Sequence, residues 1–403
     1  MLDNHFSPLV LKGRELLPIV QGGMGVGISA HRLAGTMASL GAVGTLSSVD
    51  LRRHHEDLMA ISKNADKETV NNANCVALDR EIQATKKLSG GLGLVAVNIM
   101  KALSEYATHV RQCCRSGADA LVVGAGLPLD LPDLVDEKPD IGLIPILSDA
   151  RGIKLIIKKW ARKGRLPDAI VIEHPRYAGG HLGSSKIEDL NDPRFDFENV
   201  IPATQEFFRA EGIGDKQIPL IPAGGINSHE RVRQLTDMGA AAVQLGTAFA
   251  VTQEGDAHEN FKRVLLDAKA EDIVEFISVA GLPARAVRTP WLENYLKHLP
   301  KLTAAAHVKP RCSLKFDCLA ECGLRDGIAK IGQFCIDMQL SFALRGDKMK
   351  GLFFRGSTAL PFGNYMGTVK ELIEYLLTGV KPEEALVVTS AKSHKMFEIR
   401  AVS

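Results

Sequence analysis

The sequence has few aromatic residues, little net charge and no long apolar run. Aromatic side chains make up 5% of the 403 residues, and 49 basic residues face 47 acidic ones, a net charge of +2. This balance gives no reason to expect nucleic acid binding, and so few aromatics leave no stacking surface for a single strand. No apolar run approaches the roughly 18 residues that a membrane span needs. We therefore expect neither a nucleic acid nor a membrane as a partner.

The sequence also has few cysteines and no recognisable targeting signal. Seven cysteines, an odd number, argue against a disulfide framework in a chain of this length. The amino-terminal residues carry no basic stretch followed by an apolar core, so we expect no signal peptide and a cytoplasmic protein. The spacing of Cys312, Cys318 and Cys322, with Cys335 further on, does not match the C-x₂-C pairs of structural zinc sites. We predict no metal.

Short apolar runs alternate with amphipathic helix patterns along the first part of the chain. This alternation is typical of a parallel sheet, and polar residues and glycines gather where the runs end. We therefore predict an α/β fold, a (β/α)8 TIM barrel over residues 1–254, with Ser29 and Ser228 as N-caps of two of its helices. The expected strands are 16–21, 42–46, 93–100, 120–123, 141–147, 169–172, 218–223 and 241–245.

Two stretches depart from this alternation, one between the second and third expected strands and one after the eighth. Residues 50–92 are longer than a minimal connection, and their polarity predicts a surface excursion before a helix at 76–88. Residues 255–345 predict a smaller helical domain inserted after the eighth strand. Residues 346–403 would return to the barrel, add a final helix at 368–377 and end in a tail. The helices expected in the inserted domain are 259–269, 272–279, 291–298 and 328–344.

Two consecutive strand ends present glycine-rich backbone at the same edge of the sheet. Gly224 and Gly225 follow Ala223, and Gly246 and Thr247 follow the next run. Glycine lets main-chain N–H groups approach a ligand, and such groups suit an anion. In a TIM barrel the loops after strands seven and eight form the usual phosphate site. The pattern predicts a cofactor phosphate at this edge.

Motifs at several strand ends, taken together, resemble the nitronate monooxygenase (2-nitropropane dioxygenase) family. That family also contains flavin-dependent enoyl-acyl-carrier-protein reductases and NAD(P)H:quinone reductases. The matching motifs are PIVQGGMG at 18–25, VN at 97–98, AGGHLG at 178–183, IPAGGI at 221–226, QLGTAF at 244–249 and GLPARAVR at 281–288. This ordered set is more specific than any one glycine pair.

The resemblance implies an FMN-containing barrel with the helical domain as a substrate and lid domain over the flavin. The flavin would carry the electron chemistry, and the protein would bind and orient it. The implied cofactor-binding residues lie at the strand ends. They are Gly22, Gly23 and Met24 beside the isoalloxazine, Asn98 at its polar edge, Gly179 and Gly180 near the ribityl chain, and Ala223, Gly224, Gly225, Gly246 and Thr247 around the phosphate.

His181 is the residue that the resemblance places opposite the substrate. A histidine titrates near neutrality and can serve as proton donor or acceptor. For an alkyl nitronate, which O₂ would oxidise, it would stabilise the anionic substrate; for an enoyl thioester it would polarise the carbonyl or deliver a proton. His174 lies outside the matching motif and is a weaker candidate.

Alternatives to a nitronate monooxygenase stay open at this point. One is an NAD(P)H-dependent reductase of enoyl thioesters or quinones, although no G-x-G-x-x-G fingerprint supports a separate nicotinamide domain. Another is a flavin-binding subunit without turnover. The window 285–311 is basic and is either a solvated face or a site for an acyl carrier protein or a coenzyme A thioester. Its charges are Arg285, Arg288, Lys297, Lys301, Lys309 and Arg311 against Glu293. The oligomeric state, a homo-oligomer included, is left open.

Overall fold

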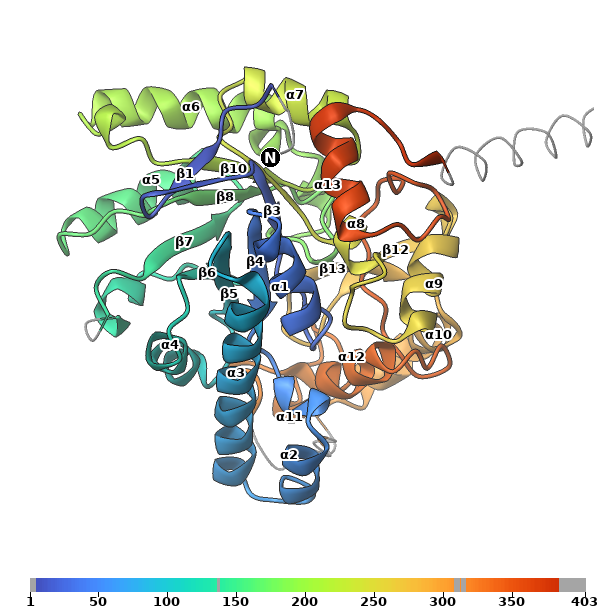
Figure 1. The fold of residues 1–403 in the computed structure, drawn as a ribbon. Coiled ribbons are helices and arrows are strands. Elements are labelled where there is room, and N and C mark those ends of the chain that lie inside the picture. The colour runs from blue at the N-terminus through green and yellow to red at the C-terminus, as the bar shows by residue number, and fades with distance from the viewer. Residues whose placement is uncertain (1–4, 136–137, 308–311, 313–316, 384–403) are drawn as a thin grey trace, which may run out of the picture.

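A computed structural model describes residues 5–135, 138–307, 312 and 317–383 of the chain (Figure 1). Eight parallel strands close into a barrel in the order β10-β11-β3-β4-β5-β6-β7-β8. Each predicted strand has its counterpart, which confirms the TIM barrel. The strands are β3 Ile19–Gln21, β4 Val43–Ser47, β5 Leu94–Met100, β6 Ala120–Gly124, β7 Gly142–Leu147, β8 Ile170–Glu173, β10 Leu220–Ala223 and β11 Val243–Leu245.

Helices cover the outside of the barrel (Figure 1). The packing of α1 on β4 is so close that a Cβ on Gly44 would lie 1.8 Å from the carbonyl oxygen of Ala34, so only glycine is tolerated there. The covering helices are α1 His31–Ser39, α3 Lys67–Ser89, α4 Tyr106–Arg115, α5 Ala150–Ala161, α6 Phe197–Ala210, α7 His229–Asp237, the short α8 Thr247–Ala250 and α13 Val369–Thr378.

The N-cap prediction is confirmed at α7 and wrong at α1. Ser228 caps α7 as predicted, because its hydroxyl accepts a hydrogen bond from the Arg231 N–H at 3.2 Å. Ser29 does not cap α1; its hydroxyl accepts from the Met24 N–H at 2.8 Å instead. The first turn of α1 is satisfied by Asp256, which lies more than 200 residues away. Its carboxylate accepts from the N–H groups of Ala30, Arg32 and Leu33 at 2.8 to 3.1 Å.

Residues 50–92 contain more helix than expected. A 3-10 turn, η1 Leu51–His54, is followed by α2 Glu56–Ile61 and then by α3, which starts nine residues before the predicted helix at 76–88. Asp66 caps α3 by accepting from the Thr69 N–H at 2.8 Å. The stretch expected as a surface loop is therefore mostly helical, and α2 and α3 extend from the body at the bottom of Figure 1.

The segment after the barrel is not purely helical, and the helix predicted at 272–279 is wrong. These residues form β12 Ile273–Ile277, which pairs antiparallel with β13 Pro283–Val287. A third strand, β9 Gly180–His181, pairs with β13 and so joins this sheet to the barrel mouth. The helices of the segment are α9 Glu259–Asp267, α10 Pro290–Ala304, α11 Gly323–Asp326 and α12 Ile336–Leu344, so the predicted helix at 328–344 is helical only in its second half.

Residues 351–356 lead back to the barrel as expected. Phe354 forms a bridge with Ala286 of β13, and the Gly356 N–H donates to the Thr247 hydroxyl at 3.1 Å. The final helix, α13, then packs against α7 and α8. Whether residues 255–345 fold as a unit of their own stays a prediction.

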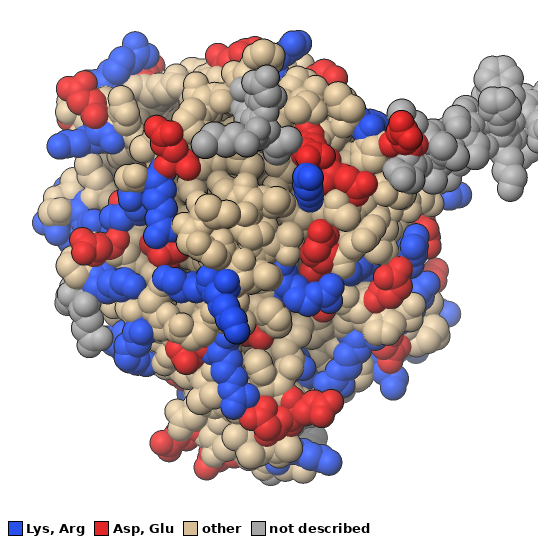
Figure 2. Space-filling view, in the orientation of Figure 1, with Lys and Arg blue, Asp and Glu red and all other residues tan. Residues whose placement is uncertain are grey.

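The opposite end of the barrel is closed by the amino-terminal hairpin. Its strands are β1 Leu9–Leu11 and β2 Arg14–Leu16, and Leu9, Leu11 and Leu16 join the cluster that fills the barrel interior. Basic and acidic side chains are interspersed over the face shown in Figure 2. Within the described ranges, none of the helices combines the length and the apolar character that crossing a bilayer requires.

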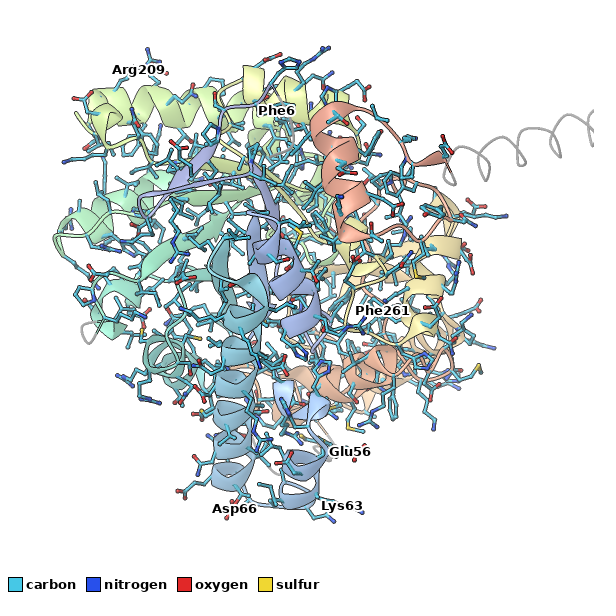
Figure 3. All side chains as sticks on the ribbon, in the orientation of Figure 1. Phe6, Glu56, Lys63, Asp66, Arg209 and Phe261 are labelled. Carbon is cyan, nitrogen blue, oxygen red and sulfur yellow. The ribbon has the colours of Figure 1, made fainter. Side chains whose placement is uncertain are left out.

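We predict that Asp256→Ala lowers the free energy of unfolding by about 2 kcal/mol, because three N–H groups of α1 lose a charged, largely buried acceptor. Urea unfolding followed by tryptophan fluorescence measures the effect. The matched control is Asp66→Ala, which removes an exposed cap of a single N–H at the tip shown in Figure 3 and should cost less. Equal losses in the two variants would contradict the role of Asp256.

Candidate active site

A cavity of about 690 Å³ opens at the carboxyl ends of the barrel strands and extends under α12. This volume lies within the usual range for small-molecule and cofactor sites. All the residues predicted from the strand-end motifs line it. They are Gly22, Gly23, Met24, Asn98, Gly179, Gly180, His181, Ala223, Gly224, Gly225, Gly246 and Thr247. Positions more than 200 residues apart in the sequence thus meet around one space.

The backbone after β10 approaches its neighbours too closely for any side chain. Gly224 and Gly225 have φ of +100° and +75°, which glycine adopts most readily. A Cβ on Gly225 would lie 2.8 Å from the Tyr177 ring, and one on Gly179 would lie 2.6 Å from the Gly356 nitrogen. These glycines leave main-chain atoms as the surface of the cavity, which is what a bound phosphate needs.

The floor of the cavity carries amide side chains. A Cβ on Gly23 would lie 2.2 Å from the Cβ of Asn98, so Asn98 packs directly under the glycine loop. The Asn98 amide donates to the Val122 carbonyl at 3.3 Å. Gln244 of β11 is only 8% exposed, and its Oε1 is a buried acceptor with no hydrogen-bond partner among the described residues. A buried acceptor of this kind costs free energy unless a ligand satisfies it.

His181 lies on the short strand β9, opposite Ala284 of β13. This pairing fixes the backbone of His181. Its Nε2 lies 3.0 Å from the hydroxyl of the fully buried Ser278, and its ring centroid lies 6.0 Å from that of Phe354. Burial lowers the pKa of His181 to about 4. The imidazole is therefore uncharged at neutral pH.

Arg285 is not part of a basic surface, which corrects the interpretation of the window 285–311. Its side chain is 2% exposed and forms an ion pair with Glu275 at 2.6 Å. It also donates to the carbonyls of Pro175 and Ala178 at 3.1 and 2.6 Å, in the loop that leads to His181. Arg288, Lys297 and Lys301 are exposed, while Lys309 and Arg311 lie outside the described residues.

The far end of the cavity is polar. Arg53 pairs with Asp50 after β4 and with Asp337 at the start of α12, the latter at 2.6 Å. Burial raises the pKa of Asp337 to about 7, and the nearby Asp50 acts in the same direction. Asn74 of α3 is 7% exposed, and in the described part of the chain its Oδ1 has no hydrogen-bond partner. This end is built from residues of 50–74, 317–319 and 336–343.

His174, the weaker catalytic candidate, has a structural position, as do two neighbouring cysteines. His174 is buried, and its Nε2 lies 3.1 Å from the Asp196 carboxylate, away from the cavity. Cys113 and Cys114 belong to the core. Among the residues that the structure describes, no three His, Cys, Asp or Glu side chains are grouped as a metal site.

Sequence reasoning missed Ser278 and Glu173 as members of the site. Ser278 lies in the turn between β12 and β13, and no motif marks it. Glu173 is the last residue of β8 and precedes the matching motif by several residues, so only its position at a strand end signals it.

The residues present fit a flavin. The glycine backbone after β10 and β11 suits the phosphate, the glycine loop after β3 leaves room for a flat ring, and the unpartnered Gln244 acceptor faces the same space. Phe261, labelled in Figure 3, lines the apolar side, stacked on Phe353 at 5.6 Å between ring centroids.

Comparisons with known proteins agree with this geometry. The family model described as nitronate monooxygenase matches residues 12–379. A probable nitronate monooxygenase from Bacillus subtilis is 27% identical over 287 residues, covering 69% of this chain and 78% of that protein. A probable nitronate monooxygenase from Staphylococcus aureus is 30% identical over 127 residues, covering 32% of this chain and 33% of that protein.

Solved structures share the fold. FabK from Thermotoga maritima superposes with a TM-score of 0.60 at 19% identity, covering 94% of this chain and 95% of that one. A nitroalkane oxidase from Streptomyces ansochromogenes gives a TM-score of 0.60 at 18% identity, covering 92% and 97%. At such identities the superpositions establish the fold, and the site rests on this chain's own residues.

We predict that Gly225→Val weakens flavin binding by about tenfold or more, because the side chain strains the backbone and collides with Tyr177. The ratio of flavin to protein absorbance in the purified protein measures it. Gly212→Val is the matched control, since Gly212 has φ of +65° but nothing within 4 Å of its Cβ position. Full FMN occupancy in Gly225→Val would refute the phosphate assignment.

Proposed function

Because the chain belongs to the nitronate monooxygenase family of flavin-dependent oxidoreductases, we propose that it binds FMN and oxidises an alkyl nitronate with molecular oxygen. One observation carries the proposal. The glycine loops suited to a flavin and the uncharged His181 line the same cavity at the carboxyl ends of the barrel strands. In such barrels, chemistry takes place at this face.

His181 would stabilise the nitronate without carrying a charge of its own. With its pKa lowered to about 4, the imidazole keeps one N–H as a donor from neutral pH down to mildly acidic pH. The Ser278 hydroxyl engages Nε2, which leaves Nδ1 without a partner among the described residues. A flavin bound above the glycine loop would supply the electron transfer, and His181 would orient the substrate's nitro oxygens beside it.

A reductase of enoyl thioesters is the second candidate. Arg288, Lys297 and Lys301 are exposed and would favour an acidic partner such as an acyl carrier protein or the phosphates of coenzyme A. In this case reduced flavin would come from NADH or NADPH, and His181 would polarise the thioester carbonyl. A homo-oligomer and a cytoplasmic location remain predictions.

Anaerobic mixing separates the two candidates. The purified yellow protein is mixed with NADH, with NADPH and with ethyl nitronate, and the flavin absorbance is followed. Bleaching by the nitronate alone supports the monooxygenase. Fast bleaching by a nicotinamide moves the assignment to the reductase, and a protein that takes up no FMN refutes both.

We predict that His181→Ala retains flavin and lowers turnover of the substrate identified above by about 10²- to 10⁴-fold. Steady-state kinetics and the flavin spectrum of the same preparation measure the two effects. His174→Ala is the control, because His174 faces Asp196 and not the cavity. Unchanged turnover in His181→Ala would refute a catalytic role for His181, and a wild type that binds flavin but turns over none of these substrates would favour a flavin-binding subunit without catalysis.

A further inference from the structure

Glu173 is the one carboxyl group that the barrel strands themselves place at the floor of the cavity. It ends β8, in register with Ala223, the residue just before the Gly224–Gly225 loop. Val171 and Ala223 both belong to the cluster inside the barrel. Since side chains alternate along a strand, Glu173 points inward as well, two residues nearer the mouth than Val171.

The Glu173 carboxyl stands without a partner in the part of the chain that the structure describes. Within residues 5–135, 138–307, 312 and 317–383, neither an ion pair nor a side-chain hydrogen bond involves it. Its Oε2 lies 3.4 Å from where a Cβ of Gly183 would be. Other carboxyls near strand ends are engaged; Asp168 before β8, for example, accepts from Arg165 at 2.8 Å.

The titratable groups around Glu173 on neighbouring elements form their contacts with other residues. Asp149, after β7, accepts from the Gly152 N–H at 2.7 Å. His181 of β9 contacts Ser278, and His174, the next residue in the chain, contacts Asp196. Arg194, in the turn η4 Pro193–Phe195, donates to Asp189 at 2.9 Å. β10 and β11 contribute Ala223 and Gln244, which carry no charge.

Burial is accordingly the one cause that moves the pKa of Glu173, and it raises this pKa to about 7. A carboxylate without a cation is disfavoured in such a place. At neutral pH the group is thus divided between a proton-bearing acid and an anion, a state typical of groups that exchange protons in active sites.

We propose that Glu173 takes up a proton when the bound flavin is reduced, and so balances the charge that reduction brings into the cavity. The inference rests on the proposed FMN site but not on the identity of the substrate. A two-electron reductant, whether substrate or added chemical, would bring negative charge into the cavity that Glu173 lines. The Glu173 carboxylate would then bind a proton from solvent, because negative charge nearby favours its protonated form.

The test is the midpoint potential of the bound flavin as a function of pH, measured with a chemical reductant and no substrate. For a two-electron couple, each proton taken up shifts the potential by about 30 mV for every tenfold change in proton concentration. Below pH 7 Glu173 is protonated in both states. Between pH 7 and 8.5 the oxidised enzyme has lost this proton and the reduced enzyme regains it, so the slope should steepen by about 30 mV per pH unit.

Glu173→Gln should remove this steepening, because the amide does not titrate. The matched control is Glu105→Gln, the same change in a cavity-lining carboxyl that pairs with Lys67 at 3.5 Å; it should keep the wild-type slope. Equal slopes in wild type and Glu173→Gln, with flavin bound in both, would overturn the proposal.

If Glu173→Gln does not fold, the pH dependence of the wild-type flavin potential tests the proposal without the variant. A potential that changes by the same amount per pH unit on both sides of pH 7 refutes proton uptake by Glu173, while the flavin assignment stands. A wild-type protein that binds no flavin refutes the proposed function and this inference together. Ethyl nitronate, nicotinamides and thioesters play no part in the measurement, so the choice of substrate does not affect it.

Discussion

The buried guanidinium of Arg285 joins the barrel to the segment that follows it. From β13 it reaches both Glu275 on β12 and the carbonyls of the loop 175–178, and its own backbone pairs with Gly180. An arginine can hold several acceptors in fixed directions because its donors are planar and always charged. The position of His181, one residue beyond Gly180, therefore depends on a contact between parts of the chain about 100 residues apart.

Burial then sets the protonation of the groups that this framework positions. His181 and Glu173 both lose water without gaining an oppositely charged partner, so each favours its neutral form. At the far end of the cavity, Arg53 compensates Asp50 and Asp337. The end at which the flavin loops lie is thus poor in fixed charge, and a charge that arises there during a reaction is felt strongly in the low local dielectric.

The sequence was sufficient for the barrel and for the glycine loops because both depend on local patterns. Apolar runs of strand length and glycines at strand ends do not need distant partners to be recognised. The antiparallel pair β12–β13 was missed because its edge residues are mixed in polarity, which resembles a helix pattern. Asp256 and Ser278 act across long separations, on α1 and on His181, and no local signal identifies such partners.

The motifs that mark the family lie at one end of the cavity, and the other lining residues form the opposite end. The flavin end is made of short loops at strand ends, where each residue is constrained by the barrel itself. The opposite end draws on Asn71 and Asn74 of α3, on residues 317–319 and on α12. These residues lie outside the barrel strands, and segments outside the scaffold strands tolerate change far better than the strands themselves. Distant relatives can therefore share the flavin end while binding different substrates, so the substrate must be argued from the polar end of this cavity.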